Sequence, residues 1–191
     1  MNLILAAQAP LRRELLGLTG LDFIVRVADI DETMSPHSAP YSEVARVSRL
    51  KALAIPREAD DVVVAADTIV VCEGRVLGKP HSAEEAKEML RLLSGRDHQV
   101  MTGMTVLRGD SAAVITEVTD LHFRELTDKE IDAYVASGEP MDKAGAYGIQ
   151  GGAALFCQRM EGDYYNVMGL PVCRLTQILR ELAPELMGDM V

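Results

Sequence analysis

One segment restricts the fold more than any other: a nearly unbroken apolar run, Val62–Ala66, that stands between Asp61 and Asp67. Three consecutive β-branched residues favour a strand, and the lack of polar alternation is typical of a strand covered on both faces, as in α/β proteins. A second apolar run, Leu3–Ala6, is followed by Pro10, which indicates a strand, a turn and a helix. We therefore expect an α/β fold in which Asp67 closes a buried strand.

The rest of the chain alternates between strand and helix signals. Two capping boxes, Ser82 with Glu85 and Thr127 with Glu130, each start a helix. Further helices are expected from residue 10, near 42–54 and near 172–182, and strands near 23–27, 70–72, 75–77, 99–107, 113–124 and 154–160. This order predicts an α/β class with a mixed, twisted sheet flanked by helices and folded into two lobes. Because no linker or repeat interrupts the pattern, residues 1–191 are expected to form a single domain.

Composition and charge exclude several classes of protein. The chain has 19 Lys and Arg against 29 Asp and Glu, a net charge of -10. A nucleic-acid polymer is not an expected partner, since affinity for its backbone comes from basic surface. The cysteines are Cys72, Cys157 and Cys173, and their odd number and wide spacing predict buried reduced thiols without disulfide or zinc. There is no basic leader and no run of ~20 apolar residues, so we expect a cytoplasmic protein without membrane contact.

Two acidic positions are candidates for chemistry. A carboxylate at a strand end, Asp67, faces the edge where α/β sheets bind ligands and could hold a metal or a water. An ordinary strand-end Asp that caps the next turn explains it as well. Glu32 ends the acidic stretch Asp29–Glu32 and could share a divalent cation with Asp67, although a solvated acidic loop accounts for the same residues.

Basic residues stand where an anion could bind. Lys79 lies between Gly78 and Pro80 in a tight loop, and Lys51 lies near the C-terminal end of the helix over 42–54. Arg12 and Arg13 belong to the start of a helix, where backbone N–H groups already favour anions. A solvated lysine and a solvated helix face are the alternative interpretations.

Residues 145–152 form the densest glycine run of the chain and contain Gln150. Glycines at this spacing allow a backbone to approach a flat or charged ligand, and a Gln side chain can read the edge of a base. A plain loop is equally compatible with the composition. The four histidines lack metal-ligand spacing and receive no role.

Taken in order, these pieces resemble one family. They are residues 3–6 with 13–16, Asp31-Glu32, Lys51-Ala52, Ala66-Asp67-Thr68, Gly78-Lys79-Pro80, residues 143–151 and residues 162–171. Over about residues 3–182 the chain is similar to the Maf family of nucleoside triphosphate pyrophosphatases, also called septum-formation-inhibitor Maf proteins. The last two segments resemble its dTTP/UTP branch. The implied fold is that of inosine triphosphate pyrophosphatases, with two lobes around a central cleft.

The resemblance implies hydrolysis of dTTP, UTP or modified pyrimidine nucleotides to the monophosphate and diphosphate, with Mg²⁺ or Mn²⁺. By resemblance, Asp67 activates the water and shares the metal with Glu32, while Lys51, Lys79 and Arg12 bind the triphosphate. Thr68 and Gln150 match positions that select the base. Family members are often dimers, so a homodimer is also expected.

The chain departs from the family in its N-terminal loop. The usual wording is Ser-x-Ser-Pro-Arg-Arg, whereas this chain has Ala7, Ala9 and Leu11 at the two hydroxyl positions and the first arginine. The loop therefore predicts a slower enzyme, in which Arg13 replaces the missing charge only in part. Two alternatives stay open: a nucleotide-binding regulator of cell division that has lost turnover, and an enzyme for a bulkier or less charged nucleotide that fits beside Leu11.

Overall fold

The computed structural model describes residues 1–188, in which strands and helices alternate. The strands are β1 (Leu3–Ala6), β2 (Ile24–Arg26), β3 (Val62–Cys72), β4 (Arg75–Leu77), β5 (Asp97–Arg108), β6 (Ser111–Phe123) and β7 (Cys157–Glu161). The α-helices are α1 (Pro10–Gly17), α2 (Pro40–Leu53), α3 (Ala83–Leu93), α4 (Asp128–Ala136), α5 (Tyr164–Met168), α6 (Val172–Leu182) and α7 (Pro184–Met187). Three short 3-10 helices, η1 (Glu139–Asp142), η2 (Ala144–Ala146) and η3 (Gly152–Leu155), follow α4.

The strands form one mixed sheet in the order β2-β1-β3-β5-β6-β7, with β4 paired to β3. Strand β1 is parallel to β2 and to β3, with Leu3 opposite Val62, whereas β4 and β7 are antiparallel to their neighbours. The predicted α/β class with a mixed sheet is confirmed. The predicted hairpin between β3 and β4 is also present, and its turn places Glu73 and Gly74 at positive φ.

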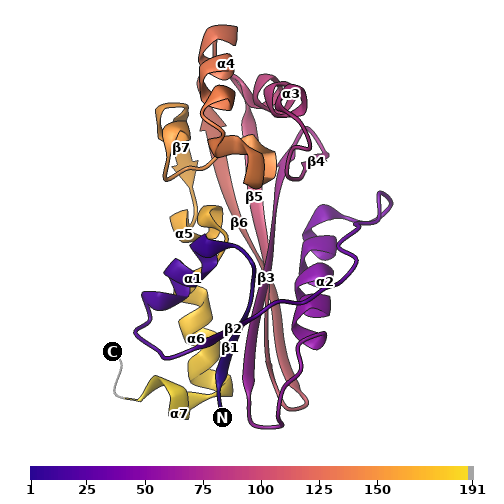
Figure 1. The fold of residues 1–191 in the computed structure, drawn as a ribbon, viewed down its shortest axis with the longest axis vertical. Helices are drawn as coiled ribbons and strands as arrows, with labels where there is room; N and C mark the ends of the chain where they lie inside the picture. Colours follow the sequence, from indigo (N-terminus) through magenta and orange to yellow (C-terminus); the bar gives the residue numbers. More distant parts are fainter. Residues whose placement is uncertain (189–191) are drawn as a thin grey trace. The chain divides into compact units, whose positions relative to one another are not determined.

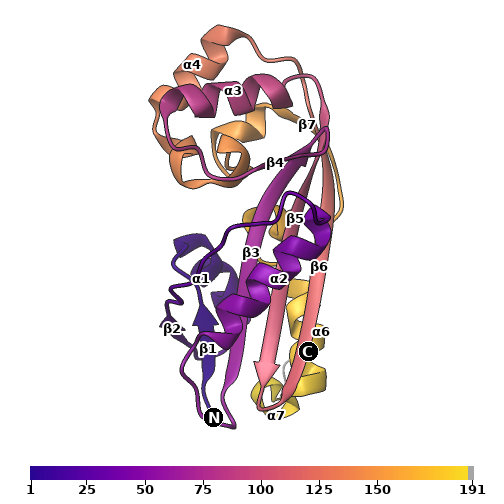
Figure 2. The same cartoon turned by 90° about the vertical axis from the view of Figure 1, so that its right-hand side faces the viewer.

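The chain divides into two compact units. Unit 1 contains residues 1–67, 102–117 and the described residues from Gly169 onward, and unit 2 contains residues 68–101 and 118–168. Strands β3, β5 and β6 each contribute residues to both units. In unit 1, α2 lies on one face of the sheet and α6 on the other (Figures 1 and 2). In unit 2, α3 packs against α4 (Figure 1).

Two predicted boundaries are wrong. Strand β3 does not end at Asp67 but runs on to Cys72, because the apolar, β-branched residues Ile69–Val71 continue the strand pattern. The last strand was expected from residue 154, but the chain forms η3 there and β7 begins only at Cys157. Asp67 is therefore a polar residue inside a long buried strand and not a residue at its end.

The structure can be compared with two further predictions, the buried reduced thiols and the lack of a membrane-spanning segment. All three cysteines are free thiols. Cys72 is buried as expected, whereas Cys157 is half-buried and Cys173 is exposed, so the prediction of buried thiols is wrong for these two. Among residues 1–188, no helix is both long and apolar enough to cross a membrane.

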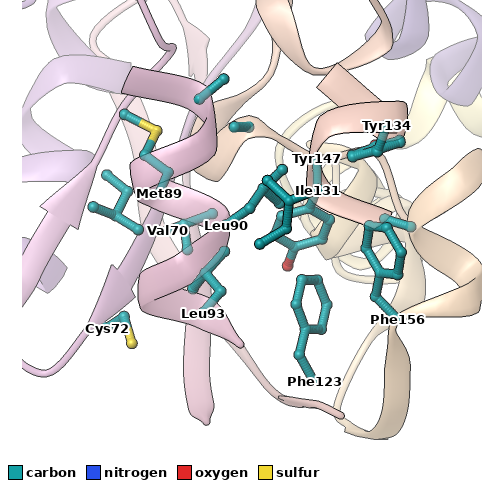
Figure 3. Packing of buried hydrophobic residues seen from close by; sticks show 14 of the residues in the cluster. Val70, Cys72, Met89, Leu90, Leu93, Phe123, Ile131, Tyr134, Tyr147 and Phe156 are labelled. Atoms are coloured by element: carbon teal, nitrogen blue, oxygen red, sulfur yellow. The ribbon is translucent and has the colours of Figure 1, made fainter. Parts of the chain in front are cut away.

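The core of unit 2 is built around an aromatic cluster, part of which is drawn in Figure 3. The ring of Phe123 lies edge-on to His98 and Tyr147, with centroids 4.8 Å away in each case. The Nε2 atom of His98 is 2.8 Å from the Tyr147 hydroxyl. Burial lowers the pKa of His98 from 6.5 to about 4, so its imidazole is neutral at neutral pH.

This buried histidine makes the stability of the protein depend on pH. The unfolded chain binds a proton on His98 below about pH 6.5, whereas the folded chain binds it only near pH 4. Stability is therefore lost as the pH falls between these values. We expect about 2 kcal/mol of the loss between pH 7 and pH 5 to come from this residue.

Urea denaturation of the wild type and of His98→Gln at both pH values measures this contribution. The variant should lose less stability than the wild type on acidification, by about 2 kcal/mol. His37→Gln is the matched control, because His37 is exposed in the loop before α2. An equal pH dependence in His98→Gln and the wild type would show that His98 is not the responsible group.

Candidate active site

Helix α2 packs directly against β5 in the sheet of unit 1, and this close contact brings Lys51 to the sheet. A Cβ atom on Gly103 of β5 would lie 2.2 Å from the Val44 carbonyl oxygen, so only glycine allows α2 to lie this close. The hydroxyls of Ser48 and Thr105 are 2.8 Å apart across the same contact. Lys51 stands in the last turn of α2, where the helix dipole favours a cation, and is 8% exposed.

The ammonium group of Lys51 bridges two carboxylates. Its Nζ atom is 2.7 Å from Asp67 Oδ1 and 3.0 Å from Glu32 Oε2. Lys51 and Asp67 have side chains that are 10% and 12% exposed, whereas Glu32 is 54% exposed. A buried ion pair of Lys51 and Asp67 is thus joined from the solvent side by Glu32, and the structure brings together three residues that the sequence had placed far apart.

Arg12 completes this group from α1. Its Nε atom donates to the carbonyl oxygen of Gly169 at 2.9 Å, which orients the guanidinium. Burial lowers the pKa of Arg12, and the charges of Asp67 and Glu32 oppose that shift. An arginine remains protonated under such a shift, so the site holds two cations and two carboxylates.

The loop that carries Glu32 is held by a pair of residues that the sequence analysis missed. Glu43, 5% exposed, accepts hydrogen bonds from the Ser35 N–H at 2.8 Å and from Arg46. Arg46 in turn donates to the Thr33 carbonyl oxygen at 2.9 Å. The Arg46 guanidinium and the Ser35 N–H lower the pKa of Glu43, so it stays ionised. The sequence shows that Glu43 and Arg46 are spaced to form an ion pair on a helix, but it does not show that the pair contacts the loop.

Two other predicted residues, Leu11 and Arg13, flank Arg12 on α1. Arg13 is exposed and lines a shallow hollow with Leu21, Asp22 and Val25 of the same unit. Leu11 is half-buried in the first turn of the helix. The structure thus gathers Arg12, and not Arg13, with the carboxylates, since successive helical residues point about 100° apart.

The remaining predicted residues belong to unit 2. Thr68 follows Asp67 in β3 and is half-buried, while Lys79 and Gln150 are exposed. The loop of Lys79 is tied to the glycine run by a hydrogen bond from the Gly145 N–H to the Gly78 carbonyl oxygen, 3.0 Å long. The charge of Lys79 is one of the causes that lower the pKa of Asp142 in η1, after the stronger effect of Lys143.

The glycine run packs closely against other residues of unit 2. Cβ atoms on Gly145, Gly148, Gly151 and Gly152 would lie 2.7, 2.8, 2.2 and 3.0 Å from side-chain atoms of Val70, Lys143, Glu139 and Tyr134. The space that these glycines leave is therefore filled by the protein itself. Packing within unit 2 therefore explains why these four positions are glycine, and the approach of their backbone to a ligand stays a prediction.

Glu32 and Asp67 are the acidic residues expected to hold a divalent cation. Glu32 and Asp67 supply the carboxylate oxygens that Mg²⁺ and Mn²⁺ prefer, and each has an oxygen within 3.0 Å of Lys51 Nζ. In the part of the chain that the structure describes, no group of three or more His, Cys, Asp or Glu residues could hold a metal ion. The two carboxylates match Mg²⁺ and Mn²⁺ in donor chemistry, and in this structure the Lys51 ammonium contacts both of them.

Comparison with known proteins identifies the family. A family model described as "Maf-like protein" matches residues 2–182. The chain belongs to this family. Two curated relatives named "dTTP/UTP pyrophosphatase", from Bacillus cereus (strain AH820) and Bacillus anthracis (strain CDC 684 / NRRL 3495), are each 48% identical over 181 residues. Each alignment covers 94% of this chain and 95% of the relative.

Among solved structures, the chain is similar in fold to a HAM1 protein from Coxiella burnetii. The TM-score is 0.50 at 17% sequence identity, covering 95% of this chain and 99% of that chain. At this identity the likeness concerns the fold alone. It agrees with the fold that the resemblance to the Maf family implied.

Proposed function

We propose that this Maf-like protein is a nucleoside triphosphate pyrophosphatase that hydrolyses dTTP and UTP to the monophosphate and diphosphate. The observation that carries the proposal is the buried Asp67 carboxylate, held at 2.7 Å by Lys51 beside Glu32 and Arg12. A positioned carboxylate next to cations suits attack of water on a phosphoanhydride. The names of the Bacillus relatives support the choice of substrate.

Asp67 acts as the general base. It takes a proton from a water molecule whose oxygen forms a bond to the α-phosphorus, while the bond from that phosphorus to the α,β-bridging oxygen breaks. The electron pair of the broken bond leaves with the diphosphate, and the proton passes from Asp67 to solvent. Lys51 fixes the direction of the carboxylate through its 2.7 Å contact. Arg12 places positive charge at the same site, where negative charge grows on the leaving group.

Other roles rest on the family. Glu32 and Asp67 would hold Mg²⁺ or Mn²⁺, which neutralises phosphate charge when bound. Lys79 is assigned to binding of the triphosphate, and Thr68 and Gln150 are assigned to selection of the base. Leu11 and Arg13 are assigned to substrate binding next to the altered N-terminal loop. Free nucleoside triphosphates are the expected partners, and the cytoplasm is the proposed location. A homodimer and a link to septum formation remain predictions from the family resemblance.

The altered N-terminal loop favours a second candidate, a nucleotide-binding regulator with little turnover. Ala9 occupies the N-cap of α1 and forms no side-chain capping bond, and Ala7 is buried. Two hydroxyl donors that other family members possess are therefore missing, each worth about 0.5–1.5 kcal/mol. We favour the enzyme because the groups that would activate water and balance its charge are retained and assembled.

A panel of nucleoside triphosphates separates the two candidates. Release of diphosphate is measured for canonical and modified nucleotides with Mg²⁺ or Mn²⁺ and with a chelator control. The proposal predicts metal-dependent release that is fastest with dTTP and UTP. Binding of nucleotides without release from any of them would favour the regulator, and preference for a bulkier or less charged nucleotide would favour the third alternative.

Leu11→Arg tests whether the altered loop limits turnover. Leu11 stands in the first turn of α1, one residue before Arg12. A charge-assisted bond to phosphate contributes roughly 1.5–3 kcal/mol, so kcat/KM for dTTP should rise about tenfold or more. Leu18→Arg is the control, because Leu18 is a 64% exposed leucine at the other end of the same helix. No gain for Leu11→Arg beyond that of Leu18→Arg would show that position 11 does not limit the enzyme.

A further inference from the structure

Gln150 lies in a tight turn whose two ends are fastened. The Gly151 N–H donates to the Gly148 carbonyl oxygen at 3.1 Å, which closes a turn over residues 148–151 with Gln150 at its third position. Gln150 is exposed, whereas Gly148 and Ile149 are buried. The position of the Gln150 side chain therefore depends on what holds the backbone at each end of the turn.

A tyrosine holds the first end. The Gly148 N–H donates to the Tyr134 hydroxyl at 3.0 Å, and that hydroxyl donates to Glu139 Oε1 at 2.8 Å. Tyr134 belongs to α4 and is 7% exposed (Figure 3). Burial and the charge of Glu139 raise the pKa of Tyr134 above its usual value, so the hydroxyl keeps the proton that it donates.

A glutamate holds the second end. The Gly152 N–H donates to both carboxylate oxygens of Glu139, at 3.0 and 3.2 Å. A side chain on Gly151 would collide with the same carboxylate, at 2.2 Å from Oε1. Glu139 also receives Lys143 Nζ on its backbone carbonyl oxygen, at 3.1 Å. The half-buried carboxylate thus accepts hydrogen bonds from two donors, the Tyr134 hydroxyl and the Gly152 N–H, and these satisfy it.

We propose that Tyr134 and Glu139 are positioning residues for base selection, because together they fix both ends of the turn that presents Gln150. This inference rests on the proposed function, in which Gln150 reads the base. Neither residue touches the nucleotide. Loosening either end lets the Gln150 side chain leave the geometry that a base edge requires, whereas none of the groups assigned to the chemical step is altered.

Tyr134→Phe removes one hydroxyl and keeps the ring in the core. The ratio of kcat/KM for dTTP over dCTP should fall about five- to tenfold, mainly through a higher KM for dTTP, while kcat at saturating dTTP stays within about twofold. Glu139→Ala should show the same change. Glu139→Gln keeps an acceptor oxygen for the Gly152 N–H, so it should lie between Glu139→Ala and the wild type.

Thr119→Val is the matched control for stability. It removes a buried hydroxyl of the same unit, which pairs with the Asp163 N–H at 3.1 Å and with Asn166 Nδ2 at 2.9 Å, away from the turn. It should lower the melting temperature and leave the dTTP over dCTP ratio unchanged. If Thr119→Val lowers the ratio as much as Tyr134→Phe does, the effect is one of general stability and the inference is overturned.

Binding of α,β-methylene analogues of dTTP and dCTP gives a readout that does not need turnover. If the wild type releases no diphosphate, the proposed function is overturned. The inference is still supported if the wild type binds the dTTP analogue more tightly than the dCTP analogue and Tyr134→Phe reduces this preference. Equal preference in Tyr134→Phe and the wild type overturns the inference alone. A wild type that binds the two analogues equally well, or binds neither, overturns the role of the turn in base selection.

Discussion

Asp67→Asn should abolish most diphosphate release and leave nucleotide binding nearly intact. A general base contributes about 10²- to 10⁴-fold to rate, and an amide cannot accept the proton of the attacking water. The Asn oxygen can still accept the hydrogen bond that Lys51 Nζ makes to Asp67 at 2.7 Å, so the surrounding structure has little reason to change. We expect kcat to fall by at least about 100-fold and the Kd of α,β-methylene dTTP to change by less than about tenfold.

Asp61→Asn is the control for this loss. Asp61 is a second buried aspartate in the same segment, 2% exposed, and it accepts bonds from the Asn2 and Glu58 N–H groups at 2.8 and 3.0 Å. Its substitution should lower the melting temperature and spare kcat. If Asp67→Asn retained the wild-type rate, Asp67 would not be the base, whatever the behaviour of Asp61→Asn.

Lys51→Met should destabilise the protein strongly, because it removes the ammonium group 2.7 Å from the buried Asp67 carboxylate and leaves Arg12 as the remaining cation of the group. Breaking such a pair costs about 3–5 kcal/mol, which corresponds to a fall in Tm of roughly 10 °C for a chain of this size. Glu32 cannot compensate, since it carries the same charge as Asp67. The two carboxylates should then bind a divalent cation more readily, so added Mg²⁺ should raise the Tm of Lys51→Met more than that of the wild type.

Lys87→Met serves as the matched substitution. Lys87 also contacts two carboxylates, Asp132 at 3.0 Å and Glu84 at 3.6 Å, but those partners are 55% and 77% exposed. Exposed ion pairs contribute little, so its Tm should stay within about 3 °C of the wild type and should not respond to Mg²⁺. Similar melting curves for the two variants would mean that the Lys51 bridge carries no special stability.

Much of the architecture could be predicted because it depends on local patterns. The capping box of Thr127 and Glu130 is present with both bonds, and the apolar run at Val62–Ala66 forms the interior of β3. The error at Asp67 has a local cause as well, because a charged residue usually ends a buried strand. Here Lys51 of α2 compensates the charge of Asp67, so the strand continues. Lys51 and Asp67 are 16 positions apart in the sequence, so the pattern of residues within the strand does not reveal their contact.

The site was predicted as a set of residues and not as an arrangement. Family motifs pointed to Asp67, Glu32, Lys51 and Arg12, but only the fold shows that one ammonium group bridges both carboxylates. The glycine run illustrates the same point. Spacing shows where side chains are missing, and it does not show that Glu139 and Tyr134 occupy the space that is left.

The central claim is that this chain cleaves a nucleoside triphosphate between its α- and β-phosphates with Asp67 as the base. Phosphorus NMR of the products from dTTP and Mg²⁺, recorded for the wild type and for Asp67→Asn, tests it most directly. The expected result is dTMP and diphosphate from the wild type and almost no product from the variant. Formation of dTDP and orthophosphate, or equal product from both proteins, would contradict the claim.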